Sequence, residues 1–238
     1  MHINCDMGEG FANEHLLMPY LSACNIACGG HVGDLHSMEQ VAGLALQHQV
    51  AVGAHPSYPD QANFGRVSIS IPEEDLIHSI SDQVAQLKSI VEKQGHSLTH
   101  IKAHGALYHD IAQDPKKAQQ FLKAIAPYRT ECQLYVPDRS VVAEEALKQG
   151  FSLVYEAFAD RNYTDDLKLV SRTQAHALIT EPERVLEHVL RMHRQQTVQT
   201  ISGKILPIQA DTFCVHSDTD NAPTIVQHLH QAFSSHER

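Results

Sequence analysis

Carboxylates, histidines and a lysine recur directly after short apolar segments of this 238-residue chain. The first cluster is N-C-D-M-G-E-G, in which Asp6 and Glu9 stand three residues apart among glycines. Glycine lets the backbone approach a ligand closely, and the two carboxylates could act as a general base, a general acid or metal ligands. The competing structural interpretation is an Asx-type turn beside a solvated glutamate.

Histidines mark the next two clusters. His31 lies among three glycines in C-G-G-H-V-G-D, which lacks the GK[ST] ending of a phosphate-binding loop, so the glycines are expected to give access to His31. An ordinary hydrogen-bonded loop histidine is the alternative. His55 begins H-P-S-Y-P-D, in which two prolines stiffen a long loop of the kind that is usually functional.

A lysine and a further histidine follow the fourth apolar segment. Lys102 and His104 are two residues apart, so both could face one site, where Lys102 would stabilise an oxyanion and His104 would transfer protons. The later clusters contain Asp160, Arg161, Asp211 and His216. Any one of these groups could be a surface ion pair, but their recurrence after at least five segments predicts one shared site.

The segments that must position these residues alternate between strand-like and helix-like patterns, which predicts an α/β fold around a parallel sheet. The expected strands are Ile3–Cys5, Ala23–Cys28, Val50–Ala54, His100–Ala103, Cys132–Val136, Leu153–Phe158 and Ile205–Gln209, with Phe213–Val215 as an eighth candidate. Periodicity alone leaves open whether these units close into a barrel or form an open doubly wound sheet. In both architectures ligands bind beyond the C-terminal ends of the strands.

Helix starts are predicted from two capping boxes, S-I-P-E at residues 70–73 and T-E-P-E at residues 180–183. The apolar stripes that should face the core are Ile80, Val84, Leu87 and Val91 in the first helix, and Leu186, Val189, Leu190 and His193 in the second. Further helices are expected at Leu35–His48, Asp114–Ala126, Ser140–Lys148 and Thr224–Phe233.

Length and composition bound the class of protein. The length fits a single α/β barrel domain spanning residues 1–238. A net charge of −10 disfavours nucleic acid and anionic membranes as partners, because both are bound through clustered Lys and Arg.

With no signal peptide and no apolar run near the roughly 18 residues of a membrane span, we expect a cytoplasmic protein. Five cysteines without a CxxC pair are expected to be reduced thiols.

Signatures of several common enzyme classes do not occur in the sequence. It contains no G-x-S-x-G nucleophile elbow, no H-E-x-x-H zinc motif and no G-x-G-x-x-G dinucleotide fingerprint. A covalent serine mechanism, a zincin and a nicotinamide-dependent enzyme are therefore disfavoured.

Seven ordered motifs together resemble the LamB/YcsF family: N-C-D-M-G-E-G-F, L-M-P-Y, N-I-A-C-G-x-H-x-G-D, V-G-A-H-P-x-Y-P-D, F-G-R, H-G-A-L-Y and F-A-D-R-x-Y. The resemblance runs from Asn4 to about Asp218. It implies an irregular (β/α) barrel like that of certain carbohydrate deacetylases. It also implies a role as the A subunit of 5-oxoprolinase, in the ATP-dependent hydrolysis of the lactam 5-oxoproline to L-glutamate, together with separate B and C subunits.

The resemblance carries over ten site residues by motif. Those expected to be catalytic are Asp6, Glu9, His31, His55, Lys102, His104 and Asp211, and those expected to bind substrate are Asp160, Arg161 and His216. Because no ATP-binding motif is visible, ATP is expected to be held mainly by a partner subunit. The chain departs from the usual family pattern at Gly30, mostly Phe in the family, at Ser57, mostly Gly, and also at Val67, Ala103 and Ser217.

Two other functions stay open. A self-sufficient metal-dependent amidase or deacetylase would hold one divalent ion with Asp6, His31 and His55. The other possibility is a protein that only binds or scaffolds within a complex. This function would not explain why so many ionisable groups are predicted to converge on one site.

Overall fold

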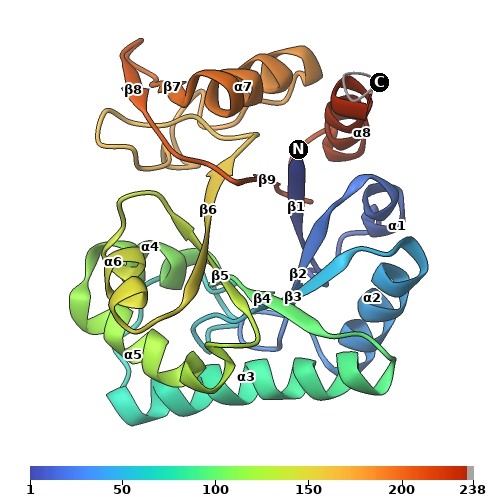
Figure 1. Cartoon of the computed structure of the whole chain (residues 1–238), viewed down its shortest axis with the longest axis vertical. Helices are drawn as coiled ribbons and strands as arrows, with labels where there is room; N and C mark the ends of the chain where they lie inside the picture. Colours follow the sequence, from blue (N-terminus) through green and yellow to red (C-terminus); the bar gives the residue numbers. More distant parts are fainter. Residues whose placement is uncertain (235–238) are drawn as a thin grey trace.

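Seven parallel strands close into a barrel in the computed structural model, which describes residues 1–234 (Figure 1). The strands are β1 (His2–Met7), β2 (Ala23–Ala27), β3 (Ala51–His55), β4 (Leu98–Ile101), β5 (Gln133–Pro137), β6 (Ser152–Phe158) and β9 (Thr212–Val215). Neighbours follow chain order, and β9 closes the ring by pairing with both β6 and β1. The predicted barrel of seven or eight strands is thus confirmed, with seven.

The barrel is irregular on one side. The pairing of β3 with β4 shifts register between Val52 and Gly53. The next ladder, between β4 and β5, joins only two residue pairs, His100 with Gln133 and Ile101 with Leu134. Beyond β4, the backbone N–H groups of Lys102 and His104 donate to the carbonyls of Ala54 and Pro56, each at 2.9 Å, so the residues after β4 lie beside those after β3.

Helices surround the barrel (Figure 1). They are α1 (Glu14–Leu17), α2 (Leu35–His48), α3 (Glu73–Lys93), α4 (Gly105–Gln113), α5 (Pro115–Ile125), α6 (Val141–Lys148), α7 (Pro182–Gln195) and α8 (Ala222–Ser234). The predicted bounds of α2 are confirmed. The helix begins at Leu35 because Asp34 caps it, accepting a hydrogen bond from the backbone N–H of Ser37. The predicted stripe of α3 is buried as expected.

Several predicted elements are wrong. Neither capping box forms, because α3 and α7 begin at Glu73 and Pro182, and the preceding residues, Pro72 and Glu181, make no side-chain cap. The segment Ile205–Gln209 supplies no barrel strand. Within it, β8 (Ile205–Pro207) pairs antiparallel with β7 (Thr197–Gln199) outside the barrel, and the eighth candidate closes the ring instead.

Helix α7 packs on a slightly different face from the one predicted. Its buried residues are Val185, Val189 and Met192, whereas His193 is exposed. Helix α4 was not predicted, because its motif H-G-A-L-Y was interpreted as the end of a strand.

Within residues 1–234, no helix is long and apolar enough to cross a membrane. All five cysteines are buried free thiols.

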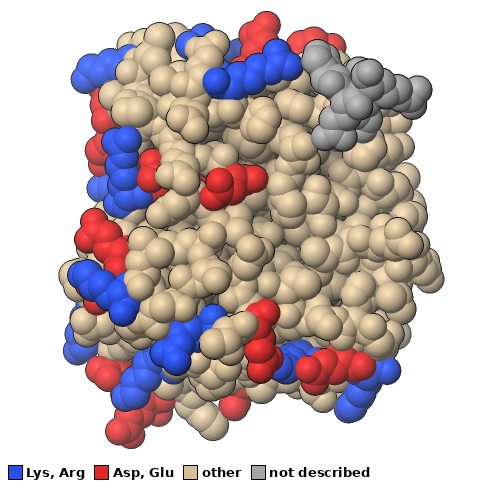
Figure 2. Space-filling view, viewed as in Figure 1, with Lys and Arg blue, Asp and Glu red and all other residues tan. Residues whose placement is uncertain are grey.

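Charged side chains are spread unevenly over the face shown in Figure 2. They gather along the left, upper and lower edges, whereas the middle of the right-hand side, over α1 and α2, carries few. Helix α2 contains a single charged residue, Glu39, and α8 contains no Asp, Glu, Lys or Arg. Leu16 in α1 and Leu35 in α2 are exposed apolar side chains.

Candidate functional site

A polar network inside the barrel fixes the position of Asp6. Asn25 on β2 donates from Nδ2 to Asn4 Oδ1 and to Asp6 Oδ1, each at 2.8 Å. Its Oδ1 lies 2.8 Å from His100 Nε2, so that nitrogen carries the proton. Burial lowers the pKa of His100 to about 3, which keeps the ring neutral. These neighbours hold the Asp6 carboxylate rigidly at the C-terminal end of β1.

Lys102 lies between two buried carboxylates. Its Nζ is 2.9 Å from Asp6 Oδ1 and 3.0 Å from Glu156 Oε1, and it donates to Cys214 Sγ at 3.1 Å. Burial raises the pKa of Asp6, but the nearby His55 and Lys102 side chains outweigh it and hold that pKa well below its usual value. Asp6 and Lys102 therefore form a buried ion pair.

Three histidines surround the Glu9 carboxylate. Glu9 Oε1 lies 3.1 Å from His31 Nε2, 3.3 Å from His104 Nδ1 and 3.9 Å from His55 Nε2. The His31 and His104 rings stack, with centroids 3.6 Å apart and planes 3° from parallel. Burial lowers the pKa of His104, and lowers that of His31 to about 4.

The F-G-R motif forms the loop that covers these rings. Phe64 and Gly65 have φ of 55° and 62°, in the left-handed region, and the Phe64 carbonyl accepts from His104 Nε2 at 3.0 Å. A Cβ on Gly65 would lie 2.9 Å from the His31 Cβ. Only glycine fits this approach, and the strained Phe64 backbone is held in place to orient His104.

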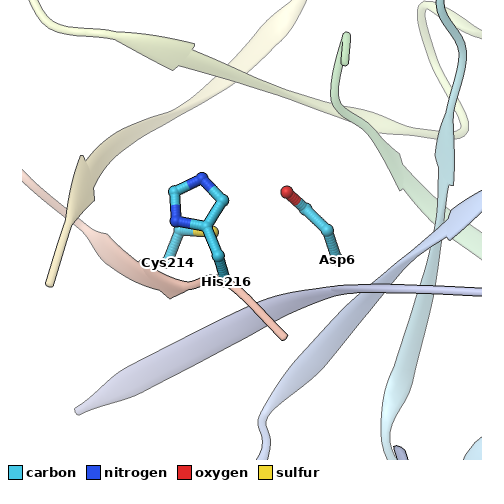
Figure 3. Close-up of side chains that lie close together, drawn as sticks. All are labelled: Asp6, Cys214 and His216. Carbon is cyan, nitrogen blue, oxygen red and sulfur yellow. The ribbon is translucent and has the colours of Figure 1, made fainter. Parts of the chain in front are cut away.

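His216 is oriented by Asp160. Its Nδ1 is 3.0 Å from Asp160 Oδ1, and the same carboxylate accepts from the His216 backbone N–H at 2.9 Å and from the Thr219 hydroxyl. Nδ1 therefore donates to this carboxylate, and in the neutral ring Nε2 holds the lone pair. Figure 3 shows the His216 ring and Asp6 on facing sides of the site, with Cys214 beside His216.

A cavity of about 510 Å³ opens above these groups. Its lining includes Asp6, Glu9, His55, Lys102, His104, Arg161 and His216. Arg66 and Arg172 on the rim both pair with Asp218. Arg161 is buried and donates to the Val170 carbonyl, and within residues 1–234 no carboxylate lies within ion-pair distance of it. Arg161 is thus the cavity cation best placed to bind an anionic group.

All residues of the chain, 1–238, match the sequence model of the LamB/YcsF family. The chain belongs to this family. Two relatives, each named as the A subunit of 5-oxoprolinase, are 36% identical to it. The relative from Bacillus cereus (strain Q1) aligns over 99% of this chain and 95% of its own length, and the one from Vibrio cholerae serotype O1 (strain ATCC 39541) over 98% and 97%.

A solved structure is also similar over its whole length. The crystal structure of the lactam utilization protein from Thermus thermophilus superposes with a TM-score of 0.91 at 31% identity, covering 100% of this chain and 97% of that one.

Two departures from the LamB/YcsF pattern are linked in space. A Cβ on Gly30 would collide with the Ser57 hydroxyl and the Gln83 side-chain amide. Gln83 holds this arrangement by exchanging hydrogen bonds with the backbone N–H and carbonyl of Ser57, at 3.0 and 2.9 Å. With Ser57 and Gln83 in these positions, a side chain at position 30 would have to displace one or both of them. The LamB/YcsF resemblance implies a different combination, mostly glycine at 57 and phenylalanine at 30.

Asp211 does not join the residues that the LamB/YcsF resemblance suggested. It precedes β9 rather than following a barrel strand, is exposed, and accepts from the Tyr155 backbone N–H at 2.9 Å. It therefore lies at the N-terminal end of the barrel, opposite the cavity. The catalytic role that the LamB/YcsF resemblance implies for Asp211 stays a prediction, and the position of Asp211 separates it from the residues of the cavity.

Two residues that were not predicted from the sequence lie in the site. Glu156 and Cys214 both contact Lys102. They point inward from within β6 and β9, whereas the predicted residues were those that follow strands. Alternation of inward and outward positions along each strand could have identified them.

Two groups within residues 1–234 bring metal-ligating atoms within 4.8 Å of one another: Asp6, Cys214 and His216, and Glu9, His55 and His104. The predicted ligand set of Asp6, His31 and His55 is not among them. His31 instead stacks on His104 and contacts Glu9 through Nε2.

Proposed function

We propose that this chain is the A subunit of a 5-oxoprolinase, which opens the lactam ring of 5-oxoproline to give L-glutamate at the expense of ATP, together with separate B and C subunits. The observation that carries the proposal is the similarity to relatives of that name over 95% or more of both chains. The barrel mouth supports it, because it combines a histidine base, buried carboxylates and an anion-binding arginine in one cavity.

The chemistry explains the need for ATP. A five-membered lactam is a stabilised amide, and phosphorylation of its oxygen by ATP makes the ring carbon a better electrophile. Water then attacks that carbon, the carbon–nitrogen bond breaks and the nitrogen takes a proton, which leaves an acyl phosphate. A second water hydrolyses this acyl phosphate and releases glutamate and phosphate. The chain has no recognisable nucleotide-binding motif, so ATP is bound mainly by a partner subunit, in the cytoplasm where ATP is available.

Three cavity residues fit the steps that involve the substrate. Arg161 binds the substrate carboxylate. His216 takes a proton from the attacking water through Nε2 and returns it to the departing nitrogen. Lys102 stabilises the negative charge of the phosphoryl group on the former amide oxygen.

Reconstitution tests the proposal. The purified chain is incubated with 5-oxoproline and ATP, with and without the cognate B and C subunits, and glutamate and ADP are measured. We expect glutamate and ADP to form together, and only when all three subunits are present. Glutamate formed by the chain alone without ATP would identify a self-sufficient amidase instead, and no glutamate with all three subunits would refute the proposal.

A further inference from the structure

One carboxylate and two imidazoles converge on a single point above the barrel. Glu9 follows β1, His55 ends β3, and His104 precedes α4. His55 Nε2 and His104 Nδ1 lie 3.0 Å apart, and Glu9 Oε1 is 3.3 Å from the second and 3.9 Å from the first. All three side chains are buried, with at most 7% of each exposed.

The facing nitrogens are both lone-pair atoms. His55 Nδ1 donates to the Lys102 carbonyl at 2.9 Å, and His104 Nε2 donates to the Phe64 carbonyl at 3.0 Å. A neutral imidazole has one proton, so these backbone acceptors leave His55 Nε2 and His104 Nδ1 unprotonated. Two lone pairs at this distance repel each other unless a cation lies between them.

The spacing suits a metal ion. A tetrahedral ion with bonds of about 2.0–2.1 Å to nitrogen and oxygen sets its ligand atoms about 3.4 Å apart. The three separations between ligand atoms in this cluster are 3.0, 3.3 and 3.9 Å, so two are shorter than that value and one is longer. Asp6 Oδ2 lies close to this cluster, 3.4 Å from His55 Nε2.

The surroundings also match a metal site. Metal-binding histidines usually donate their other ring N–H to a carbonyl or carboxylate, as both rings do here. The alternative group of Asp6, Cys214 and His216 is less suitable, because the Lys102 ammonium already contacts both Asp6 and Cys214. A second cation would be repelled there.

We propose that Glu9, His55 and His104 bind one divalent transition-metal ion of the zinc class. Two imidazole nitrogens with a carboxylate favour zinc, iron or cobalt over magnesium and calcium, which prefer all-oxygen ligands. This site does not depend on the proposed 5-oxoprolinase activity, since its test measures binding.

The full-length chain is stripped with a chelator, and binding of Zn²⁺, Co²⁺ and Mg²⁺ is measured by calorimetry and by metal analysis after dialysis. We expect one equivalent of Zn²⁺, visible absorption bands of low-symmetry Co²⁺, and no Mg²⁺ binding at the same concentrations. His104→Gln and Glu9→Gln should each weaken Zn²⁺ binding by more than the roughly 10- to 100-fold typical of outer-shell changes.

His216→Gln is the matched control, because it removes a histidine of the same cavity that belongs to the other group. It should leave Zn²⁺ affinity within a few-fold. Circular dichroism verifies that each variant is folded, and a Zn²⁺-dependent rise in Tm, present in the wild type and absent in Glu9→Gln, gives a second readout. Binding of less than a tenth of an equivalent of Zn²⁺ by the wild type would overturn the proposal. A proton shared between His55 Nε2 and His104 Nδ1 would then explain why these atoms lie so close. Loss of binding in His216→Gln with retention in His104→Gln would overturn it in favour of the other group.

Discussion

Asp160 shows how a residue can matter to chemistry without touching the substrate. It is fully buried behind His216 and is not part of the cavity lining. The LamB/YcsF resemblance grouped it with the substrate-binding residues, but its contacts are those of a positioning residue that fixes the His216 tautomer.

Replacing Asp160 with Asn should therefore impair proton transfer. An amide can donate to His216 Nδ1 and move the proton to Nε2, so the kcat of the reconstituted enzyme should fall by about 10²- to 10⁴-fold while KM changes little. Asp218→Asn is the control, because it removes a nearby carboxylate from the loop after β9, on which His216 lies. Steady-state kinetics with all three subunits measures both values, and a kcat within twofold of wild type would contradict the role of Asp160.

Much of the residue set at the barrel mouth could be predicted, but not its pairing. Asp6, Glu9, His55 and Lys102 converge because each lies at or just beyond the C-terminal end of a parallel strand, a position that apolar segments indicate. Which imidazole faces which carboxylate depends on backbone acceptors such as the Phe64 carbonyl. Those acceptors are distant in sequence and are brought together only by the fold.

At the level of elements, local signals predicted helices well where a single residue fixes the first turn, as Asp34 does for α2 and Ser140 for α6. Local signals failed where proline lies within the proposed capping box. Pro72 and Pro182 move the helix start past the Ser or Thr of the motif. No local sequence signal indicates whether β8 or β9 occupies the last position in the barrel, because the partners of a strand depend on the whole sheet.

The contact between the loop after β2 and the loop after β3 leads to a coupled prediction. Gly30→Ala should lower the free energy of unfolding by about 1–3 kcal/mol, because the new Cβ collides with Ser57 and Gln83. Adding Ser57→Gly should restore part of that loss. Urea unfolding of both single variants and the double variant gives the coupling, and strictly additive effects would show that the two positions are independent.

For the whole molecule, buried neutral His100 predicts sensitivity to acid. Its folded pKa of about 3 lies below the value of about 6.5 in an unfolded chain. Between these pH values the unfolded state binds the extra proton, so the free energy of unfolding falls as pH is lowered, by up to about 1.4 kcal/mol per pH unit. His100→Gln should flatten this dependence between pH 6 and 4. Urea unfolding at several pH values tests it, and equal slopes for both proteins would contradict the prediction.

The cysteines should be unreactive in the folded protein. Burial raises the pKa of Cys24 and Cys28 to about 12 and that of Cys132 to about 11, so little thiolate exists near neutral pH. Ellman's reagent should modify all five thiols in denaturant and almost none natively. Rapid reaction of the native protein would show that a thiol is accessible, and fewer than five in denaturant would show a disulfide.

The position of β9 has a consequence for biosynthesis. Ribosomes deliver the N-terminal strands first, yet β1 and β6 each keep one unpaired edge until Thr212–Val215 emerges. Open edges of this kind invite pairing with other chains. His216 follows directly after β9, so the same few residues that seal the barrel also bring in the proposed base. A nascent chain halted before that point would have two exposed edges and an incomplete cavity.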